Sequence, residues 1–390
     1  MVQGTALTAA RPEMVDPVVV FETTVLPHPN LVAAQAAIAR LHSRCQPPGS
    51  RPLKARALLI VGAPGAGKTT ALEDYQRAYP DVALENTGKG IVSVPTDALR
   101  DADRRPIVYV EAPKKTTQRA LVTALLGAFG YKAADHWDTN DIIRKIEFYA
   151  DQMGTEMIFI DEGHHMVSST KPEQTEDVAE FIKSLLNRTK RQIVIAGLPA
   201  LLQITCYRQL HRRLQPSMIL APYNWSTRSG RFHFSVLLAT FEKVLELPEP
   251  SGLAKSDFAK RFYVATGGEI GIVSKYLSEA LSRAKAGSLR FISKELMAEV
   301  HDGWHQTYEP DDVLDFDAVL DDGVGTGQAA GSRPADNPFL CDDARLKSIW
   351  IQQQAARDAA LAALRVGSDG SRVTTLKATG RAAFTPFTRS

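Results

Sequence analysis

Short apolar runs alternate with longer amphipathic stretches across the middle of the chain. Five runs have the length and continuity of strands that are buried on both faces: residues 57–61, 106–110, 156–160, 192–196 and 217–221. Four stretches between them place apolar residues three and four positions apart, the spacing of one buried helix face: residues 68–79, 118–129, 140–152 and 176–187. This alternation predicts an α/β fold in which helices cover both faces of a five-stranded parallel sheet.

The pattern changes on both sides of this α/β core, which we place at residues 51–228. Residues 1–50 are predicted to be an N-terminal extension with one helix, and residues 229–304 contain only helical patterns, typical of a small helical lid domain. Residues 305–390 begin as an acidic, Gly-rich linker and end as a basic tail with one predicted helix. Because such a composition buries little apolar surface, we expect this segment to be largely disordered and to dock a partner protein.

Composition narrows the class of protein without pointing to a ligand. Apolar residues make up 44% and charged residues 23% of the chain, values typical of soluble globular proteins. The net charge is only +2, so any nucleic-acid contact must come from a local patch. No apolar run approaches the roughly 20 residues of a membrane-spanning helix, and no signal peptide is visible, so we expect no membrane contact. The three cysteines, Cys45, Cys206 and Cys341, are scattered and lack metal-ligand spacing, which favours a reduced, cytoplasmic protein.

The strongest chemical signal is a glycine-rich loop of the form GxxxxGK[ST] at residues 62–69. It lies between a predicted buried strand and a predicted helix, where backbone N–H groups and a helix N-terminus can surround phosphate groups. Lys68 is expected to contact the β- and γ-phosphates of ATP, and the Thr69 hydroxyl to ligate Mg²⁺. The expected nucleotide-binding residues are Gly62, Ala63, Pro64, Gly65, Ala66, Gly67, Lys68, Thr69 and Thr70.

A later apolar strand ends in two carboxylates, Asp161 and Glu162. We expect Asp161 to hold Mg²⁺, and Glu162 to orient and deprotonate the attacking water. Together with the glycine-rich loop, this pair predicts an ATPase that produces ADP and phosphate rather than a protein that only senses nucleotide. His164 and His165 follow directly, but adjacent histidines lack the i, i+4 spacing of a zinc pair on a helix, so we expect a polar role beside the nucleotide.

Two adjacent arginines, Arg212 and Arg213, precede the fifth predicted strand. Arginines placed away from their own nucleotide can reach a neighbouring subunit and stabilise charge on the transferring phosphoryl group. We therefore predict an arginine finger that acts in trans, with Arg213 favoured and Arg212 as the alternate. The alternative is that both arginines belong to a solvated helix end.

Together these motifs resemble those of the AAA+ ATPases and, more narrowly, of the TniB/TnsC family of ATP-dependent regulators of DNA transposition. The narrower resemblance rests on the pair His164 and His165, on Trp225 at a strand end and on the lid motif around Gly267, and it covers roughly residues 21–300. It implies an AAA+ P-loop NTPase fold that uses ATP and Mg²⁺.

The resemblance also implies partners and a working cycle. Members of this kind assemble as a homo-oligomeric ring or helical filament on double-stranded DNA of any sequence, recruit a transposase and a targeting adaptor protein, and disassemble when ATP is hydrolysed. Such a protein would be bacterial and cytoplasmic. DNA contacts are expected after the second strand, where Lys114, Lys115 and Arg119 would neutralise backbone phosphates and Thr116 would donate to them. A solvated helix start is the alternative there.

The chain departs from the general AAA+ pattern at two positions. Gly197 stands where a polar sensor residue is common, and Gly271 stands where many relatives carry a sensor arginine, for which Lys275 is a candidate substitute. We therefore expect slow or partner-dependent hydrolysis. Two other classes remain open: a secretion-associated AAA+ ATPase, which normally adds a membrane or peptidoglycan-binding segment, and a replication or helicase-loader AAA+ ATPase, which usually adds a winged-helix domain.

Overall fold

The computed structural model describes residues 16–45, 53–86, 91–95, 103–114, 117–167, 172–304 and 337–366. These residues group into two compact units, each described here by itself. The α/β unit comprises Pro27–Pro222, Glu269–Gly271 and Trp350–Ser390, and the helical unit comprises Met1–Leu26, Tyr223–Gly268 and Ile272–Ile349. No helix in the described part of the chain combines the length and the apolar character needed to cross a bilayer.

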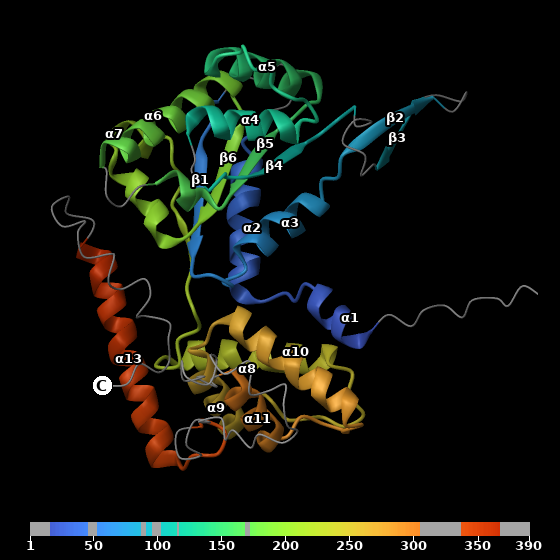
Figure 1. The fold of residues 1–390 in the computed structure, drawn as a ribbon, viewed down its shortest axis with the longest axis vertical. Helices are drawn as coiled ribbons and strands as arrows, with labels where there is room; N and C mark the ends of the chain where they lie inside the picture. The colour runs from blue at the N-terminus through green and yellow to red at the C-terminus, as the bar shows by residue number, and fades with distance from the viewer. Residues whose placement is uncertain are drawn as a thin grey trace, which may run out of the picture. The chain divides into compact units, whose positions relative to one another are not determined.

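The α/β unit is built on a five-stranded sheet with the order β4-β5-β6-β1-β7, in which every neighbouring pair is parallel (Figure 1). Each strand starts and ends within one residue of the run predicted from the sequence: β1 Ala57–Gly62, β4 Ile107–Glu111, β5 Met157–Asp161, β6 Gln192–Gly197 and β7 Met218–Leu220. In β1, β5 and β6 every residue is buried, which is why these strands are continuous apolar runs and do not alternate. The predicted α/β class is confirmed.

Helices cover both faces of this sheet (Figure 1). One face is covered by α2 Pro29–His42 and α3 Lys68–Arg77, and the other by α4 Gln118–Ala128, α5 Thr139–Gln152 and α6 Pro172–Thr189. Local signals fix the helix starts, because Thr117 accepts from the N–H of Ala120 and a capping box joins Asp138 and Asp141. The short elements η1 Gly163–Met166, η2 Pro199–Cys206 and α7 Arg208–His211 connect the strands.

Neither a second, two-stranded sheet nor the first helix of the chain was predicted from the sequence. Strands β2 Val82–Asn86 and β3 Ile91–Pro95 pair antiparallel as a separate two-stranded sheet. Helix α1 Pro17–Thr23 lies in the N-terminal extension and belongs to the helical unit, where the ring of Phe21 lies 5.7 Å from that of Phe241. The extension is therefore divided between the two units, since α2 packs on the sheet of the α/β unit.

Between residues 228 and 304 the structure has four helices, and the core of the helical unit is aromatic. These helices are α8 Arg228–Val244, α9 Ser256–Thr266, α10 Ile270–Ala286 and α11 Lys294–Trp304. Tyr263 is fully buried between Trp225, which stacks on it at 5.3 Å, and Phe234, which meets it edge-on at 5.6 Å. Aromatic pairs of this geometry stabilise a core beyond the apolar area that they bury.

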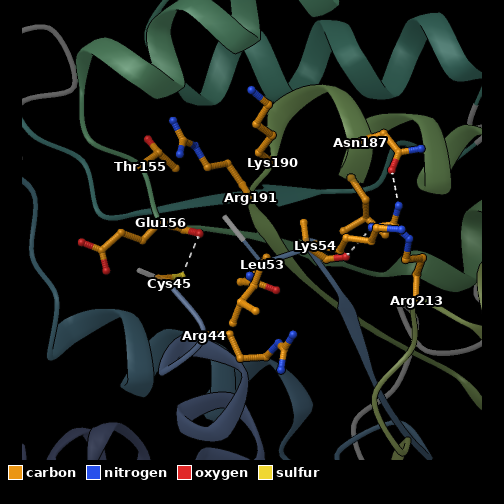
Figure 2. Close-up of a pocket in the computed structure, with 13 residues that line it drawn as sticks. Arg44, Cys45, Leu53, Lys54, Thr155, Glu156, Asn187, Lys190, Arg191 and Arg213 are labelled. Carbon is orange, nitrogen blue, oxygen red and sulfur yellow. Dashed lines mark hydrogen bonds between the residues drawn. The ribbon is translucent and has the colours of Figure 1, made fainter. Parts of the chain in front are cut away.

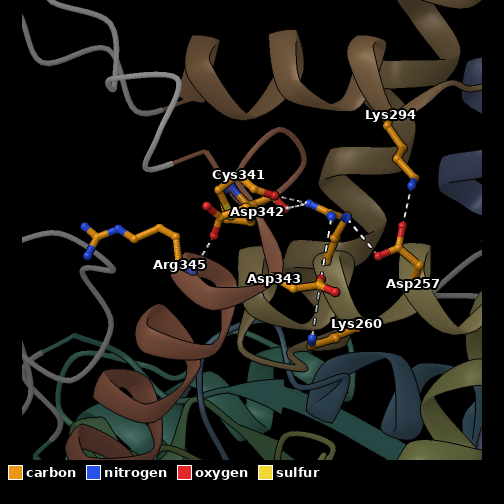
Figure 3. A network of polar contacts seen from close by, with 9 residues as sticks. Asp257, Lys260, Lys294, Cys341, Asp342, Asp343 and Arg345 are labelled. Carbon is orange, nitrogen blue, oxygen red and sulfur yellow. Dashed lines mark hydrogen bonds and ion pairs between the residues drawn. The ribbon is translucent and has the colours of Figure 1, made fainter.

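The segment from Asn337 to Ile349 packs into this helical unit, which differs from the expected unpacked tail. The ring of Phe339 is buried and lies 5.4 Å from the ring of Phe262, and Arg261 donates to the carbonyl oxygens of Pro338 and Cys341 (Figure 3). The side chain of Asn337, which is fully buried, donates to the Ala298 carbonyl at 3.0 Å and to Asp302 at 2.9 Å. Helix α13 Asp343–Val366 follows. Long-range contacts therefore order a stretch whose own composition predicted disorder.

Candidate functional site

The glycine-rich loop leaves the carboxyl end of β1 and enters α3, as the sequence predicted. Gly65 and Gly67 have φ angles of 73° and 85°, a left-handed conformation that glycine adopts without strain. Gly67 is the N-cap of α3, and no side chain caps this helix end. The first N–H groups of α3 therefore remain available to an anion, and the helix dipole favours negative charge at the same place.

Lys68 is the first residue of α3 and is buried, with 6% of its surface exposed. Its ammonium donates to the carbonyl oxygens of Gly62 at 3.1 Å and Ala63 at 2.8 Å, so it lies inside the curve of the loop. Burial lowers the pKa of this ammonium, and the carboxylates of Glu162 and Asp161 oppose the shift. A buried cation held only by carbonyl groups is suited to an anionic ligand, which would replace these weak partners.

Thr69 and Asp161 are brought together although they are far apart in the sequence. The Thr69 hydroxyl donates to Oδ2 of Asp161 at 2.6 Å, and the Tyr109 hydroxyl, from β4, donates to the same oxygen at 2.8 Å. Asp161 is almost fully buried at 2% exposure. Burial and the Asp161 carboxylate raise the pKa of Tyr109, so its hydroxyl stays a donor. A hydroxyl next to a carboxylate, both oxygen ligands, fits Mg²⁺ held beside the phosphates of a nucleotide.

Glu162 follows at the end of β5 with a φ of 52°, a left-handed conformation that is uncommon for a residue other than glycine. The turn leaves the side chain half-buried, and its Oε2 lies 3.2 Å from Nδ1 of His164. Burial, followed by the neighbouring His165, lowers the pKa of His164, so its imidazole is neutral at pH 7. The structure thus places the Glu162 carboxylate next to the Asp161 site, with the His164 imidazole beside it.

Close packing fixes the turn that carries Glu162. A Cβ atom at Gly163 would lie 2.4 Å from Cγ2 of Ile195, so only glycine fits where η1 passes over β6. A Cβ at Gly197 would lie 2.9 Å from the backbone N of His164. The absence of a polar sensor residue at Gly197 therefore has a steric cause, which the sequence alone did not provide.

The two candidate finger arginines lie at the other end of the sheet. The backbone carbonyl of Arg213 accepts from the N–H of Ala57, the first residue of β1, whereas the glycine-rich loop follows its last residue. Five residues of strand separate the two places by roughly 17 Å. The Arg213 guanidinium donates to the Ala55 carbonyl at 3.1 Å and to Asn187 at 2.6 Å (Figure 2), and Arg212 is exposed. Arg213 is thus not directed at the loop of its own chain.

The predicted DNA segment is described only in part. Lys114 is exposed, and Lys115 and Thr116 lie outside the described residues. Arg119, in the first turn of α4, donates to the backbone carbonyl oxygens of Asp135 and Trp137. These bonds use part of its guanidinium to fix the loop that follows α4.

Two residues near the nucleotide loop were missed by the sequence analysis. Tyr109 lies inside β4, where an aromatic residue reads as part of a strand, and only the pairing of β4 with β5 brings it to Asp161. His28, the N-cap of α2, is buried, and its Nε2 lies 3.9 Å from where a Cβ at Gly67 would stand. Burial lowers the pKa of His28 to about 4, so it is neutral there.

Comparison with known proteins identifies a family. A family model described as bacterial TniB protein matches residues 28–224, which is half of the chain and includes the whole nucleotide site. No curated protein matches the sequence.

Solved structures resemble the fold. The crystal structure of Cdc6p from Pyrobaculum aerophilum has a TM-score of 0.51 and 14% sequence identity, and the match covers 73% of this chain and 70% of that chain. The Aeropyrum pernix ORC2 protein gives a TM-score of 0.46 and 14% identity, over 75% of this chain and 73% of that chain. At 14% identity, the similarity to Cdc6p concerns the fold alone, and that fold is the AAA+ ATPase fold.

Proposed function

The chain belongs to the bacterial TniB family, and we propose that it is an ATP-dependent regulator of DNA transposition that assembles on double-stranded DNA. The observation that carries this proposal is the meeting of Lys68, Thr69, Asp161 and Glu162 at one edge of the sheet, within the residues that match the family. Membership of this family supports double-stranded DNA as the proposed binding partner.

We propose that the chain hydrolyses ATP to ADP and phosphate at this site. The loop N–H groups and Lys68 would hold the phosphates, while the Thr69 hydroxyl and the Asp161 carboxylate would hold Mg²⁺. Bound Mg²⁺ would neutralise charge on the phosphates and favour attack at the terminal one. Glu162 would orient the attacking water and take its proton. Its carboxylate suits this role, because it lies beside Asp161 and can accept a proton from water.

An arginine finger in trans would complete the site. The position of Arg213 at the opposite end of β1 from the loop supports this role, because a residue there faces away from its own nucleotide. An oligomer, either a ring or a helical filament, would present Arg213 of one subunit to the nucleotide of the next. Arg212, which is exposed at the same place, is the alternate.

This role can be tested by mixing variants. Arg213→Ala protein should bind ATP but fail to hydrolyse it, and Glu162→Gln protein should behave likewise. A mixture should recover part of the activity, because some interfaces then pair an intact Arg213 with an intact Glu162. Full turnover by Arg213→Ala alone would exclude the finger.

DNA would be held mainly through its phosphates. The exposed Lys114, together with Lys115, Thr116 and Arg119 of the same segment, would contribute two or three phosphate contacts per subunit. Because each subunit adds its contacts at high effective concentration, an assembly would bind duplex DNA that a monomer barely binds. Sequence-tolerant binding is expected, since these are backbone contacts.

The assembled protein would then recruit a transposase, with a targeting adaptor protein choosing the place, and would leave the DNA when ATP is hydrolysed. We propose that this takes place in the bacterial cytoplasm. We propose that residues 305–390 contain the docking segment for these partners; of these, residues 305–336 and 367–390 lie outside the described part of the chain.

The deciding experiment is binding of random-sequence duplex DNA with and without ATP at about 50 mM salt. Binding should require ATP, should persist in Glu162→Gln, which cannot hydrolyse it, and should be lost in Lys68→Ala. The logarithm of affinity should fall with the logarithm of salt, with a slope of about −0.9 for each phosphate contacted, and Lys114→Ala should flatten this slope. If ATP-loaded protein does not bind duplex DNA, a secretion-type or other remodelling ATPase becomes the better explanation.

A further inference from the structure

Three metal-ligating side chains meet at the amino end of β5, away from the nucleotide site. His42 ends α2, Cys45 follows three residues later, and Glu156 immediately precedes β5. Nε2 of His42 lies 2.8 Å from Oε2 of Glu156, and Cys45 Sγ donates to the backbone carbonyl of Glu156 at 3.4 Å. One ligand atom from each of the three residues lies within 4.8 Å of the others. Imidazole, thiol and carboxylate therefore converge on one point.

We propose that His42, Cys45 and Glu156 bind a zinc ion. A sulfur, a nitrogen and an oxygen ligand are the set that Zn²⁺ takes in tetrahedral sites, whereas Mg²⁺ and Ca²⁺ avoid thiolate. With bonds of about 2.0–2.3 Å, neighbouring ligand atoms would stand about 3.4 Å apart. The histidine and glutamate atoms would thus separate slightly and the cysteine sulfur would move inward.

The fourth position would face a cavity. Cys45 and Glu156 both line a pocket of about 520 Å³ on the same unit, and Figure 2 shows the Cys45 sulfur beside the backbone carbonyl of Glu156. A water molecule in this pocket would complete the tetrahedron from the side of Cys45 and Glu156, because His42 does not line the pocket. Three protein ligands with one open position is the ligand number of catalytic zinc sites, whereas purely structural sites usually have four protein ligands.

Neighbouring residues orient the ligands in the way that zinc sites require. The Tyr75 hydroxyl lies 3.0 Å from Nδ1 of His42, so Nδ1–H can donate to it and leave the lone pair of Nε2 for the metal. Arg104 donates to Oε1 of Glu156 at 3.1 Å, which leaves Oε2 directed at His42. In both ligands, the atom that would not bind the metal is thus held by a neighbouring side chain.

The surroundings of Cys45 favour the thiol, so a metal ion must displace its proton to bind. Burial, followed by the Glu156 carboxylate, raises the pKa of Cys45 to about 12, so without metal it is a thiol. Binding would displace this proton, and the Cys45 thiolate and Glu156 carboxylate would then balance the two positive charges of the ion. Arg191, which lines the same pocket, favours the thiolate. Zinc uptake should therefore release a proton from a thiol.

The position of the site indicates what zinc would do. Its ligands join the end of α2 to the start of β5, a strand of the central sheet, and the Asp161 site lies at the far end of that strand. The ion would therefore fasten α2 to the sheet and take no part in ATP hydrolysis. A metal-free network is the alternative, in which His42 pairs with the Glu156 carboxylate and the Cys45 thiol donates to the Glu156 backbone carbonyl.

The test is zinc content of the full-length protein after exposure to Zn²⁺ and dialysis into chelator-free buffer. Wild type should retain one zinc per chain, and Cys45→Ser should retain none. Cys206→Ser is the matched control, because Cys206 is an exposed free cysteine elsewhere on the chain. The Cys206→Ser protein should retain one zinc per chain. Replacement by Co²⁺ should give a thiolate-to-cobalt charge-transfer band in wild type and Cys206→Ser, and none in Cys45→Ser.

A second variant keeps the test valid if Cys45→Ser folds poorly. Tyr75→Phe leaves all three ligands in place but removes the partner of Nδ1, and it should weaken zinc affinity by about 10–100-fold in competition with a chelator. A wild-type protein that retains no zinc would overturn the proposal. So would a Cys45→Ser protein that retains as much zinc as Cys206→Ser.

Discussion

Replacing Gly163 with alanine tests how tightly the turn that carries Glu162 packs on the sheet. The added Cβ would lie 2.4 Å from Cγ2 of Ile195 and 3.1 Å from the Ala196 carbonyl oxygen. Carbon atoms in contact are about 3.5–4.0 Å apart, so one side must move by about 1 Å. Because β6 is held between β5 and β1, we expect most of this movement in η1 and in Glu162, the residue before it.

The expected cost follows from this movement. Overpacking a core costs about 1–3 kcal/mol, and in a unit of this size 1 kcal/mol lowers the melting temperature by about 2–4 °C, so Gly163→Ala should melt about 2–12 °C lower. A misplacement of about 1 Å at Glu162, the proposed water-orienting residue, should cost on the order of 100-fold in ATP turnover. Affinity for ATP should change much less, since the loop and Lys68 are not touched.

The same substitution at Gly127 is the control. Gly127 is exposed in α4 and a Cβ there would have nothing within 4 Å, so Gly127→Ala should melt at the same temperature or higher, with normal turnover. Combining Gly163→Ala with Ile195→Ala, which removes the colliding methyl group, should cost less than the sum of the two. If Gly163→Ala melts and turns over ATP like Gly127→Ala, the close packing argued here is wrong.

Two further substitutions test other parts of the structure, each by chemical unfolding. Phe339→Ala should lower the free energy of unfolding by about 3–5 kcal/mol, because it removes a buried ring, whereas the neighbouring Leu340→Ala, at 48% exposure, should change it by less than about 0.5 kcal/mol. Equal effects would mean that this segment is not packed. Tyr109→Phe should cost about 1.5–3 kcal/mol, since the buried Asp161 carboxylate loses a donor at 2.8 Å, and unchanged stability would argue against that bond.

The fold of the α/β unit could be predicted because its signal is local. A strand that is buried on both faces must be apolar at every position, and a helix between two such strands must have one apolar side. Lys68, Thr69, Asp161 and Glu162 were found for the same reason, since each stands at the carboxyl end of a recognisable strand or at the start of the helix after it. Parallel pairing then brings these ends together.

What could not be predicted depends on contacts between distant residues. Phe339 stands in a polar stretch of the sequence. Its place in a core is shown only by its contact with the ring of Phe262 and by the hydrogen bond from Arg261 to the neighbouring Pro338 carbonyl. The proposed zinc ligands were overlooked because the cysteines were compared with each other for metal-ligand spacing. His42 and Glu156 are 114 positions apart and meet only because α2 packs beside the sheet.

Two glycines indicate why the proposed ATPase would need groups from outside its own chain. A Cβ at Gly197 would lie 2.9 Å from the backbone N of His164, and one at Gly271 would lie 2.6 Å from the Gly65 carbonyl oxygen. A polar side chain at either place would therefore push against the turn after Glu162 or against the nucleotide loop itself. Gly197→Asn, which restores a polar residue at a sensor position, should accordingly lower both the melting temperature and ATP turnover. Turnover above that of wild type would show that a missing sensor residue limits hydrolysis. Turnover below that of wild type would leave the neighbouring subunit's arginine, or a bound partner, as the group that stabilises the transferring phosphate.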